Sequence, residues 1–261
     1  MPRIRVLPFA LLTVFLSFEA AAREPAAPPK PRTILAIGGH AGDMELTAGP
    51  MLVSQRKKGD RIVLLHLTLG EKGNRKLSAE EYGRQKRSEA EAVAGAIGAE
   101  VVFGPWKDAE LPDDEAARRW VAGVIRDVRP ELVVTHWRES MHRDHRAAHR
   151  IANDAILLAA LDVAGVEGEP WRGVRSVWYA ENWEDKPGFE PYVFVEVSSA
   201  MDAWREAVSK YEFARGIISG FPYIDYYSAL ATVRGAEAWK GKAVAFAVED
   251  HARRRVVEGV P

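Results

Sequence analysis

Two short runs of histidine and aspartate contain the residue types that bind a metal ion in proteins. His40 and Asp43 follow an apolar segment that ends in two glycines, and His142 and His145 follow a second apolar segment much later in the chain. Zinc accepts imidazole nitrogens and carboxylate oxygens, and two imidazoles with one carboxylate leave a fourth position open for water. Water at such a position becomes a nucleophile near neutral pH. The two runs therefore predict a metal-dependent hydrolase, with His40, Asp43 and His145 as ligands.

Each run on its own also has a purely structural explanation. A lone His-x-x-Asp is a weak signal, and the run at His142 could simply be the polar start of a helix. If His145 binds the metal, His142 lies close to it without being needed as a ligand. An imidazole at such a place can protonate a leaving amine or stabilise a developing oxyanion. We therefore predict a catalytic role for His142.

The elements that must position these runs alternate along the chain. Short β-rich segments predict strands, and longer segments with apolar residues at helical spacing predict helices between them. The predicted strands are Thr33–Ile37, Arg61–Leu69, Val101–Phe103, Leu132–Thr135, Arg172–Tyr179 and Tyr192–Val197. The predicted helices are Met44–Lys58, Ser78–Ile97, Asp113–Val128, a helix from Ser199 to about Phe213, and a mostly helical stretch over Tyr226–Phe246.

Continuous apolar strands separated by helices are typical of a parallel sheet that is covered on both faces. We therefore predict an α/β fold, with a Rossmann-like, doubly wound, mostly parallel sheet and helices on both faces, in one domain. In the usual strand order 3-2-1-4-5, the first and fourth strands are neighbours where the order reverses. The loops after them carry His40 and Asp43 on one side and His142 and His145 on the other. The topology thus predicts that the two runs meet.

The composition excludes some functions and restricts the ligands. With 36 basic and 37 acidic residues, the chain lacks the positive balance of a nucleic-acid-binding domain. It has no cysteine, so any metal site must use histidine, aspartate or glutamate. The charge balance favours a small-molecule or glycan substrate over a nucleic acid.

The N-terminus is typical of an exported protein. Two arginines precede the apolar run Val6–Phe18, and small residues follow it, as in a signal peptide. We predict a signal peptide over 1–22, a proline-rich linker over 23–32 and the domain over 33–261. The apolar run is shorter than the roughly 20 residues of a membrane span. Cleavage would leave a periplasmic or extracellular protein without a stable membrane span, and an uncleaved anchor is the alternative.

Five segments form an ordered set of motifs. Residues 40–46 match His-Pro-Asp-Asp-x-Glu-Leu, 68–73 resemble Thr-x-Gly-Glu-x-Gly, 87–90 with 97–98 resemble an Arg-x-x-Glu-Ala helix ending in Leu-Gly, 103–111 resemble Gly-x-x-Asp-Gly-x-Leu, and 142–146 match His-Pro-Asp-His-Arg. In these motifs the chain resembles the PIG-L/LmbE-type deacetylases, a superfamily of zinc-dependent enzymes that remove acetyl groups from N-acetylglucosamine-bearing molecules. The resemblance covers roughly residues 33–160.

The resemblance implies roles for individual residues. The implied Zn²⁺ ligands are His40, Asp43 and His145, the implied catalytic residues are His142 and Asp144, and the implied substrate contacts are Arg87, Asp108 and Glu71. Asp144 would support the site, because carboxylates outside the ligand set orient imidazoles. Another divalent ion, such as Fe²⁺, could take the place of zinc, because affinity order alone does not decide which metal is bound.

One position departs from the family pattern. The family has an aspartate, taken as the general base, where this chain has Gly42. Glycine cannot accept a proton, so the base role could fall to Glu45, Asp144, Glu71 or His142, or the metal could act without a base. General-base help is worth about 10²–10⁴-fold in rate. The expected function is an exported N-deacetylase acting on an N-acetylated amino sugar or glycoconjugate, and the alternative is a non-catalytic or weakly catalytic carbohydrate-binding protein that holds a metal.

Tryptophan provides a further expectation about the substrate. The chain has eight tryptophans, and Trp106 and Trp137 follow predicted strands close to the site motifs. Aromatic faces can support sugar rings, although core packing is the ordinary role of a buried tryptophan. We predict that Trp137 contacts the substrate.

Overall fold

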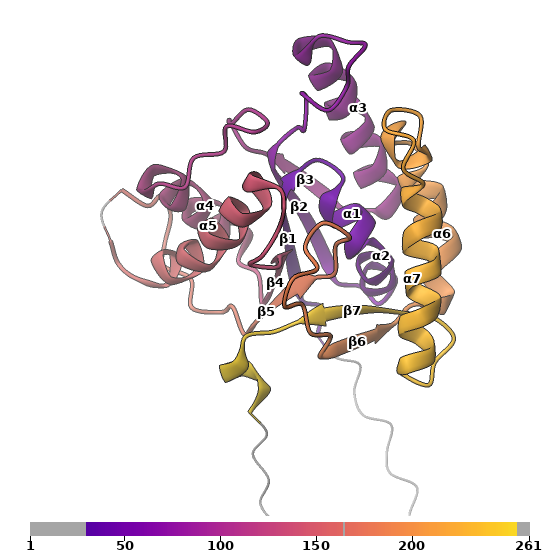
Figure 1. Cartoon of the computed structure of the whole chain (residues 1–261). Helices are drawn as coiled ribbons and strands as arrows, with labels where there is room; N and C mark the ends of the chain where they lie inside the picture. The colour runs from indigo at the N-terminus through magenta and orange to yellow at the C-terminus, as the bar shows by residue number, and fades with distance from the viewer. Residues whose placement is uncertain (1–29, 164, 255–261) are drawn as a thin grey trace, which may run out of the picture. The chain divides into compact units, whose positions relative to one another are not determined.

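A seven-stranded sheet forms the centre of the described part of the chain (Figure 1). The computed structural model describes residues 30–163 and 165–254. The strands are β1 (Thr33–His40), β2 (Arg61–Thr68), β3 (Glu100–Phe103), β4 (Leu132–His136), β5 (Ser176–Ala180), β6 (Val193–Glu196) and β7 (Ala243–Ala247), in the order β3-β2-β1-β4-β5-β7-β6. The first five strands in this order pair in parallel, and β7 is antiparallel to both of its neighbours, β5 and β6. The predicted fold class and the neighbouring placement of the first and fourth strands are confirmed.

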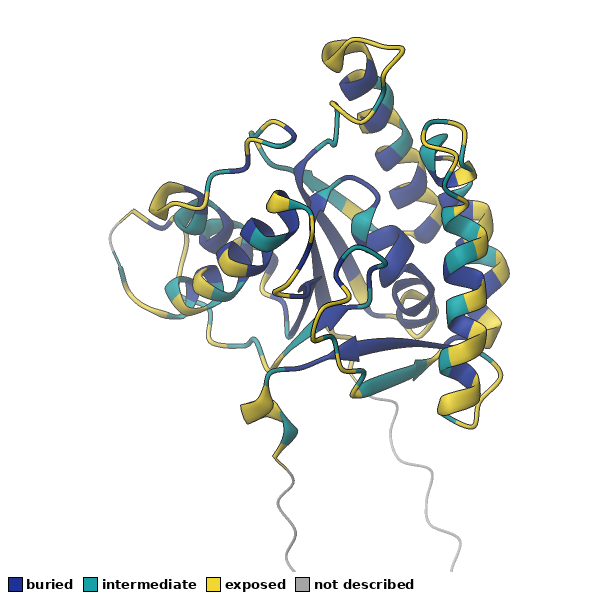
Figure 2. Ribbon diagram, viewed as in Figure 1, coloured by how far each residue is buried: buried dark blue, intermediate teal, exposed yellow. Residues whose placement is uncertain are grey.

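Helices cover both faces of this sheet. They are α1 (Asp43–Thr47), α2 (Gly49–Lys57), α3 (Ala79–Ile97), α4 (Glu115–Val128), α5 (Arg143–Ala160), α6 (Met201–Val208) and α7 (Tyr223–Glu237), with short 3-10 turns η1 (Ser198–Ala200), η2 (Phe213–Arg215) and η3 (Asp250–Arg253). Helices α4 and α5 pack on one face, and α1, α2, α3, α6 and α7 lie on the other. The sheet is therefore buried between two helical layers (Figure 2).

The sequence of β1 explains why both faces need covering. Ile34 and Ala36 point into the core shared with α2, α3 and α6, while Leu35 and Ile37 point into the core shared with α4 and α5. All four are almost completely buried. Because successive side chains of a strand point to opposite faces, a continuous apolar run requires an apolar layer on each side.

Three predicted helices differ from the structure. The helix predicted from Ser199 to about Phe213 starts with the turn η1, and α6 ends at Val208, before the separate turn η2. The predicted helix Met44–Lys58 is divided into α1 and α2, because Pro50 near the start of α2 cannot continue the hydrogen bonding of the preceding turn. The last residues of the stretch predicted as mostly helical over Tyr226–Phe246 belong to β7. The chain leaves α7 through Trp239, which has a φ of 55°. The small apolar run that follows is then buried between two strands, an environment that local periodicity does not reveal.

The predicted signal peptide and most of the predicted linker lie outside the described residues. Within residues 30–163 and 165–254, no helix combines the length and apolar character needed to cross a membrane.

Candidate metal site and pocket

The turn between β1 and α1 brings His40 and Asp43 to one point. Gly42, between them, has a φ of 106°, in the left-handed region that favours glycine. This tight turn folds Asp43 back, so that its Oδ2 accepts a hydrogen bond of 2.7 Å from the backbone N–H of His40. Both side chains therefore lie at the carboxyl end of β1, where an open α/β sheet builds its sites.

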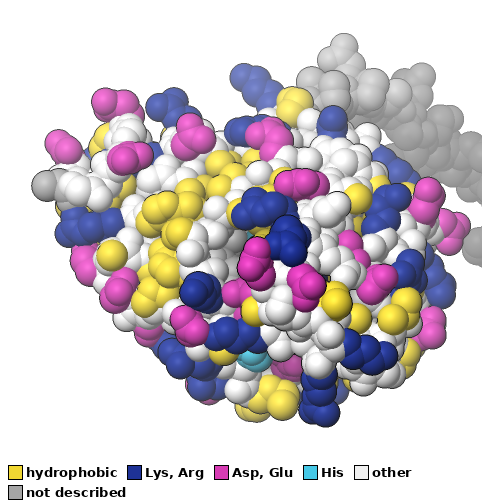
Figure 3. Space-filling model, turned by 90° about the horizontal axis from the view of Figure 1, so that it is seen from above, with side chains coloured by type: hydrophobic (Ala, Val, Ile, Leu, Met, Phe, Trp, Pro, Cys, Tyr) yellow, Lys and Arg dark blue, Asp and Glu magenta, His cyan; other side chains and the backbone are white. Residues whose placement is uncertain are grey.

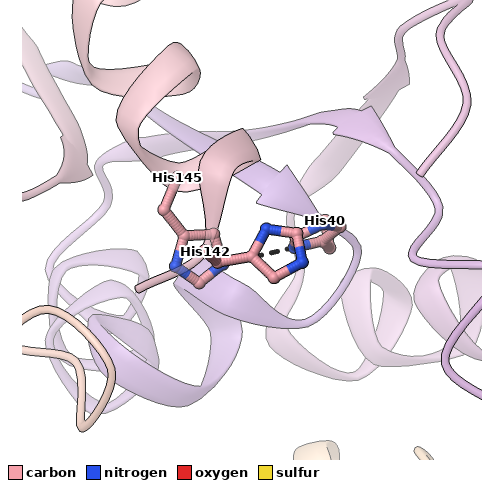
Figure 4. Close-up of side chains that lie close together, drawn as sticks. All are labelled: His40, His142 and His145. Carbon is pink, nitrogen blue, oxygen red and sulfur yellow. Dashed lines mark hydrogen bonds between the residues drawn. The ribbon is translucent and has the colours of Figure 1, made fainter. Parts of the chain in front are cut away.

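The start of α5 supplies the second run. His142 caps this helix, and its Nδ1 accepts a hydrogen bond of 3.2 Å from the backbone N–H of Asp144. Gly39 lets the helix approach β1 closely, because a Cβ atom there would lie 3.2 Å from the ring of His145. Figure 4 shows the imidazoles of His40, His142 and His145 gathered at this junction. The structure thus brings together the two runs.

Three acceptor atoms converge at the centre of the site. Nδ1 of His40 lies 3.3 Å from Oδ2 of Asp43 and 3.2 Å from Nε2 of His145, and the last two atoms are 3.4 Å apart. A tetrahedral zinc ion with bonds of about 2.0–2.1 Å separates its ligand atoms by about 3.3–3.4 Å. The triangle therefore has the dimensions of one face of a zinc coordination sphere.

Carboxylates on the far side of each ring orient these acceptors. Nδ1 of His145 lies 3.1 Å from a carboxylate oxygen of Asp185. Nε2 of His40 lies 3.2 Å from Asp108 and 3.4 Å from Asp144. A metal ion would bind the tautomers whose remaining protons face these carboxylates. It would displace a proton from His40, because burial lowers the pKa of His40 but Asp43, Asp108 and Asp144 outweigh burial and hold that pKa well above its usual value. Such a set of converging acceptors fits a cation, and the outer carboxylates would strengthen the ligands.

The electrostatics of the site favour two ligands in their metal-binding forms. Burial alone would raise the pKa of Asp43, but His145 and His40 outweigh burial and hold that pKa well below its usual value. Burial, together with the neighbouring His136, lowers the pKa of His145 to about 4. At neutral pH the carboxylate is therefore ionised and the imidazole of His145 is neutral.

His136, at the end of β4, is a site residue that the sequence reasoning missed. Its Nε2 lies 3.0 Å from the N–H of Gly39 and 3.1 Å from Oδ2 of Asp43, and its Nδ1 lies 3.0 Å from Asp185. Its ring stacks on His145 with centroids 3.9 Å apart. Burial lowers its pKa, but the carboxylates of Asp185 and Asp43 outweigh burial and raise that pKa to about 9. Its place directly before the loop of the second run was the available signal.

A cavity of about 210 Å³ opens at these ligands. Its lining includes the charged or polar residues His40, Asp43, Lys86, Asp108, His142, His145, Asn182 and Glu184 and the aromatic residues Tyr82, Trp183, Phe213, Tyr223 and Tyr227. Of the substrate contacts expected from the sequence, Asp108 lines the cavity. Asp144 lies behind His40 and supports the backbone of Ala109 with a hydrogen bond of 2.6 Å.

The other expected substrate contacts lie outside this lining. The guanidinium of Arg87 lies 4.0 Å over the ring of Phe103. Trp137 is buried, and its Nε1 donates a hydrogen bond of 2.9 Å to the carbonyl of Pro187. Glu71 accepts a hydrogen bond of 2.9 Å from the backbone N–H of Asp108, so it positions a lining residue without lining the cavity itself.

Lys86 and the loop after β5 supply the remaining polar groups. Lys86, which precedes Arg87 on α3, lines the cavity, and Arg87 does not. Its Nζ donates a hydrogen bond of 2.5 Å to the carbonyl of Ala41, and burial lowers its pKa to about 8. Glu184 and Asp185 follow β5, the neighbour of β4, and this position at the carboxyl edge was the sequence signal for them.

Comparisons with known proteins show what the chain is similar to. Residues 35–156 match the sequence model of the family described as GlcNAc-PI de-N-acetylase. The chain is 30% identical over 174 residues to a 1D-myo-inositol 2-acetamido-2-deoxy-alpha-D-glucopyranoside deacetylase of Thermomonospora curvata, in an alignment that covers 55% of this chain and 58% of that protein. The chain thus spans little more than half the length of this relative.

A relative with a different activity aligns over more of the chain. The chain is 24% identical over 217 residues to a 4-oxalmesaconate hydratase of Pseudomonas putida, with 79% of this chain and 81% of that protein covered. The chain is therefore similar in sequence both to a deacetylase and to a hydratase.

Solved structures share the fold over most of their length. A conserved protein of Thermus thermophilus superposes with a TM-score of 0.74 and 26% identity, covering 83% of this chain and 94% of that chain. The N,N'-diacetylchitobiose deacetylase of Pyrococcus horikoshii superposes with a TM-score of 0.73 at 16% identity, covering 88% of each chain, which shows a common fold. Together with the family-model match over residues 35–156, these findings show that the chain shares its fold with these proteins and is similar in sequence to deacetylases described by that model.

Proposed function

We propose that this protein is a metal-dependent hydrolase that removes an acetyl group from an N-acetylated amino sugar or glycoconjugate. The observation that carries the proposal is the triangle of acceptor atoms from His40, Asp43 and His145 at the cavity. Its dimensions fit Zn²⁺, and a divalent ion held there supplies Lewis acidity toward water and toward a carbonyl group. The deacetylase relatives support the choice of an amide bond as the target.

His142 is suited to donate a hydrogen bond at this site. Its Nδ1 is occupied as the acceptor of the helix cap, so a neutral ring carries its proton on Nε2. The ring lines the cavity and lies with its centroid 4.5 Å from that of His40. Burial and the neighbouring His40 lower the pKa of His142. The N–H on Nε2 can hydrogen-bond the oxyanion.

The groups named as replacements for the missing base differ in where they lie. Glu45 is fully buried and accepts a hydrogen bond of 2.7 Å from the hydroxyl of Tyr211. Glu71 and Asp144 accept backbone hydrogen bonds outside the cavity lining. Of the named groups, His142 faces the cavity, and the lining also includes the carboxylate of Glu184.

The cavity lining offers the substrate an apolar face and little net charge. The described lining contains the carboxylates of Asp43, Asp108 and Glu184 and one lysine, Lys86. Adding a divalent cation to these four formal charges brings their sum to zero, and burial raises the pKa of Glu184 to about 7, so this carboxyl group is partly protonated near neutral pH. The aromatic side of the cavity offers ring faces, with Trp183 as one of its members, and sugar rings can pack on such faces. In the face shown in Figure 3, positive and negative side chains are interspersed.

Acetate release from zinc-loaded protein tests the proposal. The substrates are free N-acetylglucosamine, diacetylchitobiose and an N-acetylglucosaminyl inositol, with His145→Ala and His142→Ala as matched variants. We expect release by the wild type, loss of zinc and activity in His145→Ala, and loss of activity with zinc retained in His142→Ala. A wild-type protein that holds one zinc ion but releases no acetate from any of these substrates would overturn the proposal.

Hydration of a carbon–carbon double bond is a second candidate, because the hydratase relative aligns over more of this chain than the deacetylase relatives do. The same protein is assayed for water addition to 4-oxalmesaconate. Hydration without acetate release would replace the first proposal.

A metal-containing carbohydrate-binding protein without turnover is the alternative that Gly42 suggests. Binding of N-acetyl sugars with no hydrolysis would favour it, whereas hydrolysis that disappears in His145→Ala would exclude it. We further propose that the protein is exported, on the basis of the sequence of residues 1–22. N-terminal sequencing of protein recovered from outside the cytoplasm tests this, and a mature chain that begins near residue 23 is the expected result.

A further inference from the structure

Phe213 occupies the space that a side chain at position 42 would need. A Cβ atom built on Gly42 would lie 2.4 Å from Cζ and 2.9 Å from Cε1 of Phe213. Carbon atoms in contact are normally about 3.5–4.0 Å apart. The absence of a side chain at position 42 and the presence of this ring are therefore two parts of one packing arrangement.

The ring is held in place on several sides. Its centroid lies 5.0 Å from that of Tyr211 and 5.4 Å from that of Tyr223. The ammonium of Lys86 lies 3.8 Å from the ring centroid, a cation–π distance. Because Lys86 is also hydrogen-bonded to the carbonyl of Ala41, the ring, the lysine and the β1–α1 turn pack as a unit.

This unit forms part of the wall of the cavity. Phe213 lines the cavity together with His40, Asp43 and His145. Gly42, which the ring contacts, lies in the chain between two of these three residues. The phenyl group is therefore the apolar wall that adjoins the turn carrying His40 and Asp43.

We propose that Phe213, packed against Gly42, limits the size of the acyl group that this site accepts. The inference rests on the proposed hydrolase function. An acyl carbon that reacts at this site must lie beside the ligand atoms, so its alkyl chain must fit between them and the nearest wall. The bulky ring leaves room for a short chain such as acetyl, and its removal would extend the cavity toward Gly42.

An acyl-chain series tests the size limit. Wild type, Phe213→Ala and Phe213→Leu are assayed with N-acetyl-, N-propionyl- and N-butyrylglucosamine. In the wild type we expect kcat/KM to fall with each added methylene. In Phe213→Ala we expect the acetyl-to-butyryl ratio of kcat/KM to fall by about 10-fold or more, since one methylene in an apolar pocket changes selectivity by about 10–200-fold. Phe213→Leu is expected to be intermediate and guards against a variant that does not fold.

Phe221→Ala is the matched control. Phe221 belongs to the same connection between α6 and α7, but its ring stacks on Trp183 and contacts Tyr223 and Tyr226 instead of Gly42. We expect this variant to keep the wild-type preference for acyl length. An unchanged preference in both Phe213 variants, or an equal change in Phe221→Ala, would overturn the size limit.

A double-mutant cycle tests the packing without reference to activity. Gly42→Ala is expected to lower Tm by about 5 °C in the wild-type background, through overpacking and the unfavourable φ. In the Phe213→Ala background the loss should be at most half as large, with the remainder due to φ alone. Equal losses in both backgrounds would overturn the steric pair. If the wild type released no acyl group of any length, the proposed function and the size limit would both fail, while the cycle would still report on the packing.

Discussion

At the scale of single residues, the site depends on one carboxylate that contacts two imidazoles. Asp185 lies 3.1 Å from Nδ1 of His145 through one oxygen and 3.0 Å from Nδ1 of His136 through the other. Burial alone would raise the pKa of Asp185, but these two histidine contacts outweigh burial and lower that pKa. An ionised Asp185 thus holds the ring of a ligand and the ring stacked on that ligand in fixed orientations.

Asp185→Asn should therefore weaken metal binding without unfolding the protein. Loss of such an orienting carboxylate typically costs about 10–100-fold in metal affinity. Competition with a chromophoric zinc chelator measures the change, and Asp202→Asn, at an exposed position of α6, is the matched control. Equal zinc affinities in the wild type and Asp185→Asn would show that the ligands are oriented by the backbone alone.

Gly42→Asp should not restore a faster enzyme. The new side chain would meet the ring of Phe213, and overpacking of this kind costs about 1–3 kcal/mol. We expect a lower midpoint in urea unfolding and no increase in acetate release. Combining the change with Phe213→Ala should recover part of the lost stability. A Gly42→Asp variant that is as stable as the wild type would show that the ring of Phe213 moves aside easily. Faster acetate release by the same variant would show that the wild type lacks a general base.

At the scale of elements, the site is built from loops that share one edge of the sheet. The loops after β1, β3, β4 and β5 all reach the cavity, because these strands run in parallel and their carboxyl ends meet at the same edge. The helix α3 adds Lys86 from one side. The motif Arg-x-x-Glu-Ala, aligned on Glu89 and Ala90, has its first position at Lys86 and not at Arg87. The expected contact was therefore assigned one residue too late, and Lys86 lines the cavity.

Ser78→Ala tests the element that carries Lys86. The side chain of Ser78 accepts a hydrogen bond from the N–H of Glu81, and the carboxylate of Glu81 accepts one from the N–H of Ser78, which forms a capping box. Its removal should cost about 1 kcal/mol in the free energy of unfolding. Ser88→Ala, on the exposed face of the same helix, should change the stability little. Equal effects of the two substitutions in urea unfolding would show that the cap does not stabilise α3.

At the scale of the whole molecule, metal binding and folding should be coupled. The ligands come from β1 with α1 and from α5, and the parallel pairing of β1 and β4 in the folded sheet brings them together. An ion that binds only the folded state stabilises it by about 2.7 kcal/mol when its concentration is 100 times Kd. Protein of this size gains about 2–4 °C in Tm per kcal/mol.

Removal of the metal should therefore lower Tm by about 5–10 °C relative to zinc-loaded protein. Calorimetry with and without a chelator measures this difference. In His145→Ala the difference should largely vanish, because one corner of the acceptor triangle is lost. A chelator effect of the same size in both proteins would mean that zinc acts at another place.

The sequence alone determined the types of the proposed ligands, their spacing after apolar strands, the α/β class and the neighbouring placement of the two runs. These features are local, because the period of apolar residues and the order of strands and helices can be read along the chain. The tertiary structure decided which side chains complete the site. It brought His136 and Asp185 to the ligands, turned Lys86 inward and Trp137 into the core, and packed Phe213 against Gly42. Contacts between distant segments depend on how helices and loops pack over the sheet, and no local pattern records that packing.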